Sequence, residues 1–196
     1  MKFNILTVLW RTEYLEKQYE SIPKNIDVNW ILCKSNLWKS EIPDYIKNSK
    51  DVNVIICNID IKKQEENITD FILKINEGIK MVEDGFFYIL DDDNSMHEKT
   101  YETYKKYKNK IYKMIIGKQI RSNGRLKLEA KYPSPGGIDM GNIICTTNVL
   151  KKHNFNCVNT RHSCYDWQFW TTCFKEMEQK DVLLLNEILF NHNGLR

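Results

Sequence analysis

Residues 86–94, FFYILDDDN, decide the fold. Phe86–Leu90 is a wholly apolar run, typical of a strand that is buried on both faces, and three aspartates and an asparagine follow it directly. In open α/β sheets, ligands bind at the carboxyl ends of the strands. Three adjacent carboxylates repel one another, and a divalent cation with oxygen ligands relieves that repulsion. The stretch therefore predicts a sheet strand that ends in a cation-dependent ligand site.

Strands and helices alternate on both sides of this strand, which predicts an α/β fold with a mixed central sheet flanked by helices. The strongest helix pattern, at 65–84, places five apolar residues on one face. Those residues are Ile68, Phe71, Ile72, Ile75 and Ile79. The other expected helices are 11–21, 97–109, 147–153 and 165–178, and the other expected strands are 3–9, 28–33, 52–58, 111–117, 125–130, 143–147 and 182–185. Residues 191–194 read as an irregular end.

Composition excludes several classes of protein. The chain has 196 residues, enough for one core, and no repeat or linker, so we expect a single domain over 1–196. A net charge of +3 is too small to predict a nucleic-acid partner. No apolar run approaches the roughly 20 residues of a membrane span, and the first residues do not form a signal peptide, so we expect a cytoplasmic protein. The six cysteines lack a Cys-x-x-Cys pair, which predicts reduced, packed thiols and no zinc site.

The acidic cluster has three other possible interpretations. A solvated turn with a capping box at Ser95–Glu98 would explain the residues after Asn94, but not the three acids before it. A P-loop hydrolase requires Gly-x-x-x-x-Gly-Lys-Ser/Thr, which the sequence lacks. A haloacid-dehalogenase-like phosphatase carries its Asp-x-Asp after the first strand, whereas this cluster follows about the fourth.

The strand followed by Asp-Asp-Asp-Asn resembles the Asp-x-Asp motif of GT-A glycosyltransferases. It is most similar to the motif of the β-1,3-glucuronosyltransferases, glycosyltransferase family 43, and compact GT-A domains of large DNA viruses are also similar. Four further segments resemble that family in the same order, as short islands over most of the chain: Lys74–Ile79, Ile138–Ile143, Tyr165–Phe169 and Phe190–Asn193. Two positions depart from the family, because Ile75 replaces an arginine beside Lys74, and Asp166 replaces a glutamate.

The resemblance implies a GT-A domain with a nucleotide-sugar half at about 1–95 and an acceptor half at about 96–196. It implies a metal-dependent enzyme that moves a sugar, favoured as a UDP-sugar, to a glycan hydroxyl with inversion. Asp93 would bind Mn²⁺ or Mg²⁺ together with Asp91 and His192. Asp91 would also lie near the ribose, and Asp92 would reach the ribose or the sugar. Asp166 would be the general base, although an aspartate there also suits a helix cap.

Further residues are candidates for donor or acceptor contacts. The loop after the first strand would hold the base and ribose, with Arg11 either on a phosphate or on the surface. Asp60 would meet the uracil edge, and Asp139 would face the donor sugar or the acceptor. Trp167 would stack on an acceptor sugar or pack in the core, as would Trp170. The donor set is Thr7, Leu9, Trp10, Arg11, Tyr14, Asp60, Lys74, Asn76, Asp91 and Asp92, and the sugar set is Asp139, Met140, Gly141 and Trp167.

Three alternative functions stay open at this point. A retaining transferase on the same fold would use His192 as a metal ligand. A nucleotidyltransferase would need a glycine-rich basic loop after the first strand, and Leu9–Thr12 is not such a loop. A non-catalytic module would bind the nucleotide sugar without transferring it.

Overall fold

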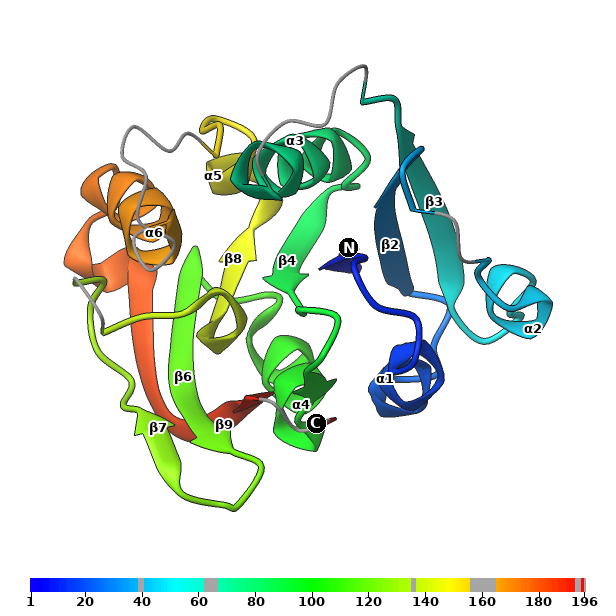
Figure 1. Cartoon of the computed structure of the whole chain (residues 1–196). Helices are drawn as coiled ribbons and strands as arrows, with labels where there is room; N and C mark the ends of the chain where they lie inside the picture. The colour runs from blue at the N-terminus through cyan, green and yellow to red at the C-terminus, as the bar shows by residue number, and fades with distance from the viewer. Residues whose placement is uncertain (39–40, 62–66, 135–136, 156–164, 193–194, 196) are drawn as a thin grey trace.

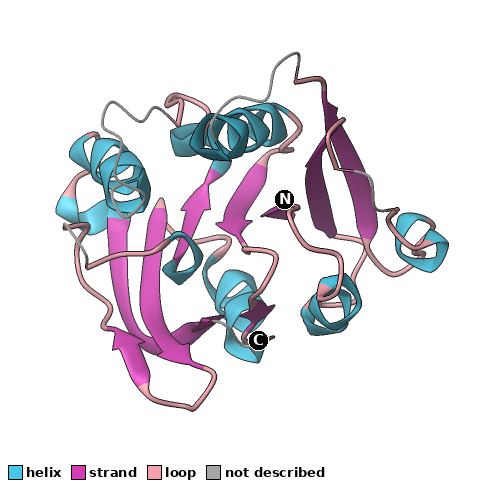
Figure 2. Ribbon diagram, viewed as in Figure 1, coloured by secondary structure: helices cyan, strands magenta, loops and turns pink. Residues whose placement is uncertain are grey.

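The structure, a computed structural model, describes residues 1–38, 41–61, 67–134, 137–155, 165–192 and 195, with the backbone alone at 67–69 and 165–166. Its described strands form one sheet in the order β3-β2-β1-β4-β8-β6-β9-β5, with β7 paired to β6 (Figures 1 and 2). The strands are β1 Lys2–Val8, β2 Val28–Ser35, β3 Asn53–Ile59, β4 Gly85–Ile89, β5 Ser95–Met96, β6 Met114–Arg121, β7 Leu126–Leu128, β8 Ile143–Thr146 and β9 Val182–His192.

The sheet is mixed, as the sequence predicts. Strands β1 to β4 run parallel to one another, β8 is antiparallel to both β4 and β6, and β9 is again parallel to β6. In the register of β1 and β4, Leu6 lies beside Ile89. The loop that follows β1 and the acidic residues that follow β4 therefore leave the sheet side by side, at the same edge.

Helices cover both faces of the sheet, which explains the wholly apolar strands (Figure 1). Successive strand residues point to opposite faces, so that Leu6 packs in one core cluster and Ile5 in the other. The first cluster includes residues of α3 Asn67–Lys80, α5 Thr147–Leu150 and α6 Tyr165–Lys175. The second includes residues of α1 Leu15–Ser21, α2 Asp44–Lys47 and α4 Glu98–Tyr107. Two 3₁₀ turns, Met140–Asn142 and Gln179–Asp181, complete the elements.

Several expected elements differ from the observed ones. The helix expected at 11–21 begins only at Leu15, because the residues before it are held against the acidic cluster. The strand expected at 182–185 continues to His192 through its pairing with β6, so the prediction of an irregular end is wrong at Asn191 and His192. Ser95 pairs with β9 rather than capping α4, whose N-cap is His97.

Two further expectations concern thiols and membrane spans. Cys33, Cys57, Cys145 and Cys173 are buried free thiols, while Cys157 and Cys164 lie outside the described residues. Across the described part of the chain, no helix has both the length and the apolar content to cross a membrane.

Candidate functional site

The acidic residues after β4 line a cavity of about 340 Å³ at the carboxyl edge of the sheet, here called the carboxylate pocket. Its walls come from the ends of β1, β4 and β9, together with one residue of α3. Six predicted site residues meet there, although they lie far apart in sequence. The lining residues are Val8, Trp10, Arg11, Phe71, Asp91, Asp92, Asp93, Asn94 and His192.

Asp92 fastens the β1 loop to the end of β4. One of its carboxylate oxygens accepts hydrogen bonds from the backbone N–H groups of Trp10 and Arg11, both at 2.7 Å. The other accepts from the Arg11 guanidinium, with Nε at 3.0 Å. Asp92 is only 2% exposed. These contacts make Asp92 a structural clamp, and the ribose or sugar contact expected for it stays a prediction.

Arg11 connects two of the three carboxylates. Its guanidinium pairs with Asp92, and its Nη1 donates to Asp93 at 3.1 Å. Partial burial disfavours the charged guanidinium, but the hydrogen bonds and charges of the two carboxylates outweigh it and raise the pKa of Arg11. A guanidinium has five N–H donors, so that N–H groups remain for an anionic ligand in the pocket.

A buried glutamine holds the acidic turn in place. Nε2 of Gln18, on α1, donates to the carbonyl oxygens of Asp91 at 2.7 Å and Asn94 at 3.2 Å. Nδ2 of Asn94 donates to the Asp91 carboxylate at 3.1 Å. Gln18 was not predicted as a site residue from the sequence. The feature that could have indicated it is a polar side chain between apolar residues of a predicted helix.

Asp91 lies where negative charge accumulates. Burial, followed by the charges of Asp139, Asp93 and Asp92, raises the pKa of the Asp91 carboxyl to about 8, against an opposing effect of Lys127. The pocket thus concentrates more carboxylate charge than its own cations neutralise. A bound cation would relieve this repulsion.

We expect the metal-free protein to lose stability as the pH rises from about 4 to about 8. The folded-state pKa of Asp91 is raised, so the folded protein holds this proton more tightly than the unfolded chain does, and ionisation disfavours folding. Urea denaturation in chelator at several pH values measures the slope. Asp91→Asn should flatten it relative to the exposed control Asp84→Asn. An unchanged slope in Asp91→Asn would contradict the assignment.

His192 closes the pocket from β9 and contacts a lysine that the sequence analysis did not find. Nζ of Lys127, on β7, lies 3.0 Å from Nδ1 of His192 and pairs with Asp139 at 2.7 Å. Partial burial and Lys127 lower the pKa of His192, although Asp139 and Asp93 oppose them. No sequence pattern marks Lys127, because the pairing of β7 with β6 places it here.

Asp139 is held as an anion at this end of the pocket. Burial disfavours its charge, but Lys127, Gln119 and the Met140 N–H, which all donate to its carboxylate, lower the pKa of Asp139. A hydrogen bond from its own N–H to Asn142 completes a capping box around the 3₁₀ turn. Asp139 therefore lies beside the carboxylate pocket in a fixed orientation.

The donor types of the pocket suit a hard divalent cation. Asp91, Asp93 and His192 line one cavity. The two carboxylates offer the oxygen ligands that Mn²⁺ and Mg²⁺ prefer, whereas an imidazole suits Mn²⁺ better than Mg²⁺. Within the described residues, however, no three His, Cys, Asp or Glu side chains converge as a ligand set. Arg11 contacts Asp93, and Lys127 contacts His192. A cation would therefore compete with these two side chains.

Four predicted site residues are buried in the protein interior rather than exposed in the pocket. Thr7 is fully buried and accepts a hydrogen bond from the indole N–H of Trp30 at 3.1 Å. Leu9 and Met140 belong to the core. At Gly141, an added Cβ would come within 2.1 Å of the Phe190 ring, so this glycine permits close packing on β9. These four residues are not among those that line the pocket, and their predicted ligand contacts stay predictions.

Two predicted donor contacts on α3 act on protein groups instead. Lys74 is 1% exposed, pairs with Asp70 at 2.8 Å, and places Nζ 3.8 Å from the centre of the Trp10 ring. The ammonium group of Lys74 therefore packs against the face of the Trp10 ring. Asn76 exchanges two hydrogen bonds with the backbone of Phe155, at 2.9 and 2.7 Å, and joins α3 to the chain after α5.

The remaining predicted residues lie outside the carboxylate pocket. Tyr14 directly precedes α1. Asp60 is exposed, accepts from Asn36 at 2.6 Å, and lines a neighbouring cavity of about 330 Å³ that also includes Trp38. Trp167 is half-buried on α6 and packs against the core.

Two further candidates lie on α6: Trp170, whose side chain is described, and Asp166, of which the backbone alone is described. Trp170 is fully buried, as its core interpretation predicts. Asp166 is the second residue of α6, but its side chain lies outside the described residues.

Solved structures of similar fold were found. The chain is similar to S. aureus TarS 1–349, with a TM-score of 0.72 and 14% identity over 98% of this chain and 60% of that one. It is also similar to the same TarS fragment in complex with UDP-GlcNAc, with a TM-score of 0.65 and 14% identity over 97% of this chain and 58% of that one. A mannosyltransferase from Pyrobaculum calidifontis, in complex with GDP-Man and Mn²⁺, has a TM-score of 0.62 and 7% identity over 98% of this chain and 56% of that one.

These likenesses confirm the predicted fold, an α/β domain with a mixed central sheet flanked by helices. The chain spans about 60% of the length of the solved chains that it matches. No protein-family model and no curated protein matches the sequence.

Proposed function

We propose that this chain is a metal-dependent glycosyltransferase that moves a sugar from a nucleotide diphosphate, favoured as UDP, to a hydroxyl of a glycan. One observation carries the proposal. Asp91, Asp93, Arg11 and His192 line one pocket at the carboxyl edge of a sheet, whose fold recurs in structures holding UDP-GlcNAc or GDP-Man with Mn²⁺. The likeness to family 43 stays part of this proposal.

The pocket offers two ways to bind a diphosphate, through a divalent ion held by its carboxylates and through the guanidinium of Arg11. A divalent ion bound at Asp93 would stabilise negative charge on the departing nucleotide diphosphate. Arg11, held by Asp92, would direct its remaining N–H groups at a phosphate oxygen. Trp10, 38% exposed and supported by Lys74, offers a ring edge or face to the nucleoside.

The neighbouring cavity suits a pyrimidine base. Asp60 and Trp38 line it where β2 and β3 end, one strand beyond β1. A carboxylate accepts the ring N–H of uracil, and an indole ring packs against the base face. The structures of TarS 1–349 in complex with UDP and with UDP-GlcNAc support the preference for uracil.

Asp166 is the proposed general base. It lies in the first turn of α6. Its carboxylate would take the proton from an acceptor hydroxyl as that oxygen attacks the anomeric carbon. Attack in line with the departing diphosphate inverts this carbon. The developing positive charge on the sugar would be stabilised by the carboxylates of Asp91 and Asp139 nearby.

We expect Asp166→Asn to lower turnover by roughly a thousandfold while donor affinity stays within about twofold, because the amide cannot accept the proton. Release of UDP in the presence of acceptor measures turnover, and titration with a UDP-sugar measures affinity. Asp181→Asn, at the far end of the sheet beside Lys113, is the matched control. Unchanged turnover in Asp166→Asn would remove this residue from the mechanism.

A thermal-shift screen of nucleotide sugars, with and without Mn²⁺, tests the proposed function directly. A ligand that binds only the folded protein stabilises it by roughly 2.7 kcal/mol at a hundred times its dissociation constant. A Mn²⁺-dependent shift with one UDP- or GDP-sugar, lost in Asp93→Ala, supports the proposal and identifies the donor. A shift without UDP release in the presence of any glycan acceptor favours a binding module. The absence of any shift refutes the donor site.

A further inference from the structure

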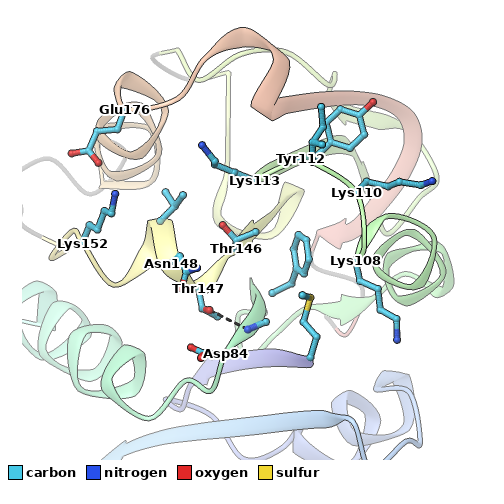
Figure 3. A pocket seen from close by; sticks show the side chains of 15 residues that line it. Asp84, Lys108, Lys110, Tyr112, Lys113, Thr146, Thr147, Asn148, Lys152 and Glu176 are labelled. Atoms are coloured by element: carbon cyan, nitrogen blue, oxygen red, sulfur yellow. Dashed lines mark hydrogen bonds between the residues drawn. The ribbon is translucent and has the colours of Figure 1, made fainter.

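A cavity of about 620 Å³ lies at the edge of the sheet opposite the carboxylate pocket (Figure 3). Gly85 and Phe86, at the start of β4, form part of its wall, whereas the acidic cluster follows the other end of this strand. The remaining wall comes from the chain between α4 and β6, from α5, and from the residue after α6. The proposed sugar transfer makes no use of this cavity, here called the opposite-edge cavity.

The chain that borders this cavity is strongly basic. Residues 105–113, KKYKNKIYK, here called the lysine loop, contain five lysines and no acid. Lys108 and Lys110 lie on one side of the cavity and Lys152 on the other (Figure 3). Within the described residues, only Lys113 of the loop forms an ion pair, with Asp181 at 2.9 Å. The other four lysines therefore carry positive charge that no carboxylate in the described part of the chain neutralises at close range.

The acids at the cavity do not reverse this charge. Asp84 and Glu176 both line it. Asp84 lies 3.9 Å from Nζ of Lys151, and Glu176 lies 3.4 Å from Nε2 of His153, so each already has a basic neighbour outside the lysine loop. The loop side of the cavity is therefore the positively charged side.

A large apolar side chain is exposed in the middle of these lysines. Ile111 is 68% exposed and lines the cavity, as does Met1 at 66%. The rings of Tyr107 and Tyr112 pack edge to face beside it, with centroids 5.9 Å apart. Lysines that surround an exposed apolar residue, together with tyrosines, are the composition that binds at the interface of an anionic bilayer.

We propose that the lysine loop docks this protein on an anionic lipid surface, with Ile111 entering the headgroup region and the opposite-edge cavity facing the lipids. Charge complementarity selects the occupant, because phosphate and carboxylate headgroups match lysines that lack acidic partners. The exposed isoleucine favours lipid over a nucleic acid, since insertion at the inner side of the headgroup region buries its apolar surface and phosphate contacts alone do not. The carboxylate pocket, at the other edge of the sheet, then faces away from the lipid.

Flotation of the intact chain with vesicles tests this proposal. We expect binding to phosphatidylcholine vesicles that contain phosphatidylserine, little binding to phosphatidylcholine alone, and release by high salt. Replacing Lys106, Lys108 and Lys110 with glutamine should weaken the partition coefficient by roughly a hundredfold. Ile111→Ser should weaken it by roughly tenfold at unchanged charge.

The control variant removes three exposed lysines elsewhere, Lys17, Lys50 and Lys131, and should keep most of the binding. Thermal unfolding of each variant shows whether it is folded. An equal loss in the control would show that net charge alone acts, and would overturn the proposal. So would the absence of vesicle binding by the unmodified chain, or binding to RNA or heparin without binding to vesicles. Donor binding does not enter these measurements, so they stand apart from the proposed sugar transfer.

Discussion

Asp93→Asn should abolish the effect of Mn²⁺ on donor binding and lower turnover by roughly a thousandfold. Asp93 lines the carboxylate pocket at 5% exposure and its carboxylate contacts Arg11, whereas Asp92 holds the backbone of the β1 loop. An amide is a weaker ligand for a hard cation than a carboxylate. The charge stabilisation that a metal gives a departing diphosphate is worth several kcal/mol, which corresponds to factors of about ten per 1.4 kcal/mol.

The measurement compares donor-dependent UDP release in Mn²⁺ and in chelator for both proteins. Asp84→Asn is the matched control, because this exposed aspartate lies at the other end of β4. Its kinetics should be unchanged. Full turnover of Asp93→Asn, or full turnover of the unmodified chain in chelator, would refute the metal-dependent mechanism.

The competition between Arg11 and the cation for Asp93 also predicts that Arg11→Gln binds Mn²⁺ more tightly and the donor more weakly.

The fold could be predicted because its signals are local and repeated. The apolar run before Asp91 is long enough to specify a strand buried on both faces. Of the five apolar residues predicted on one face of α3, Phe71, Ile72, Ile75 and Ile79 pack in the core. The carboxyl end of that strand then fixed the place of the acidic cluster. Trp10 and Arg11, predicted as donor contacts in the loop after the first strand, lie beside this cluster because the loops after β1 and β4 leave the sheet side by side.

The details of the site depend on contacts that span many residues of sequence. Lys127 reaches His192 only because β7 and β9 both pair with β6. Likewise, no local pattern separates Asp92, which fastens the β1 loop, from Asp91 and Asp93, since all three follow the same strand. Lys74, predicted as a donor contact, places its Nζ 3.8 Å from the centre of the Trp10 ring, an arrangement that no local pattern in the sequence indicates.

Asp92→Ala should lower the free energy of unfolding by about 2–4 kcal/mol and weaken donor binding indirectly. The substitution leaves two backbone N–H groups and part of a guanidinium without their acceptor, at a site that is 2% exposed. This loss of unfolding free energy is smaller than that expected from breaking a fully buried ion pair, because the Arg11 side chain is 31% exposed. Urea denaturation, with midpoint and slope compared to the unmodified chain, measures the loss.

Arg11→Gln separates the two parts of the clamp. It removes the ion pair but keeps both backbone hydrogen bonds to the Asp92 carboxylate, so it should cost less stability than Asp92→Ala, at about 1 kcal/mol. The double variant should then cost less than the sum of the single losses, because the two side chains share contacts. Equal losses in both single variants would show that the ion pair, rather than the backbone bonds, holds the loop. In that case a diphosphate that binds the Arg11 guanidinium would release the β1 loop. The expected result means the opposite: the backbone hydrogen bonds to Asp92 keep Trp10 and Arg11 in place while the guanidinium turns to its ligand.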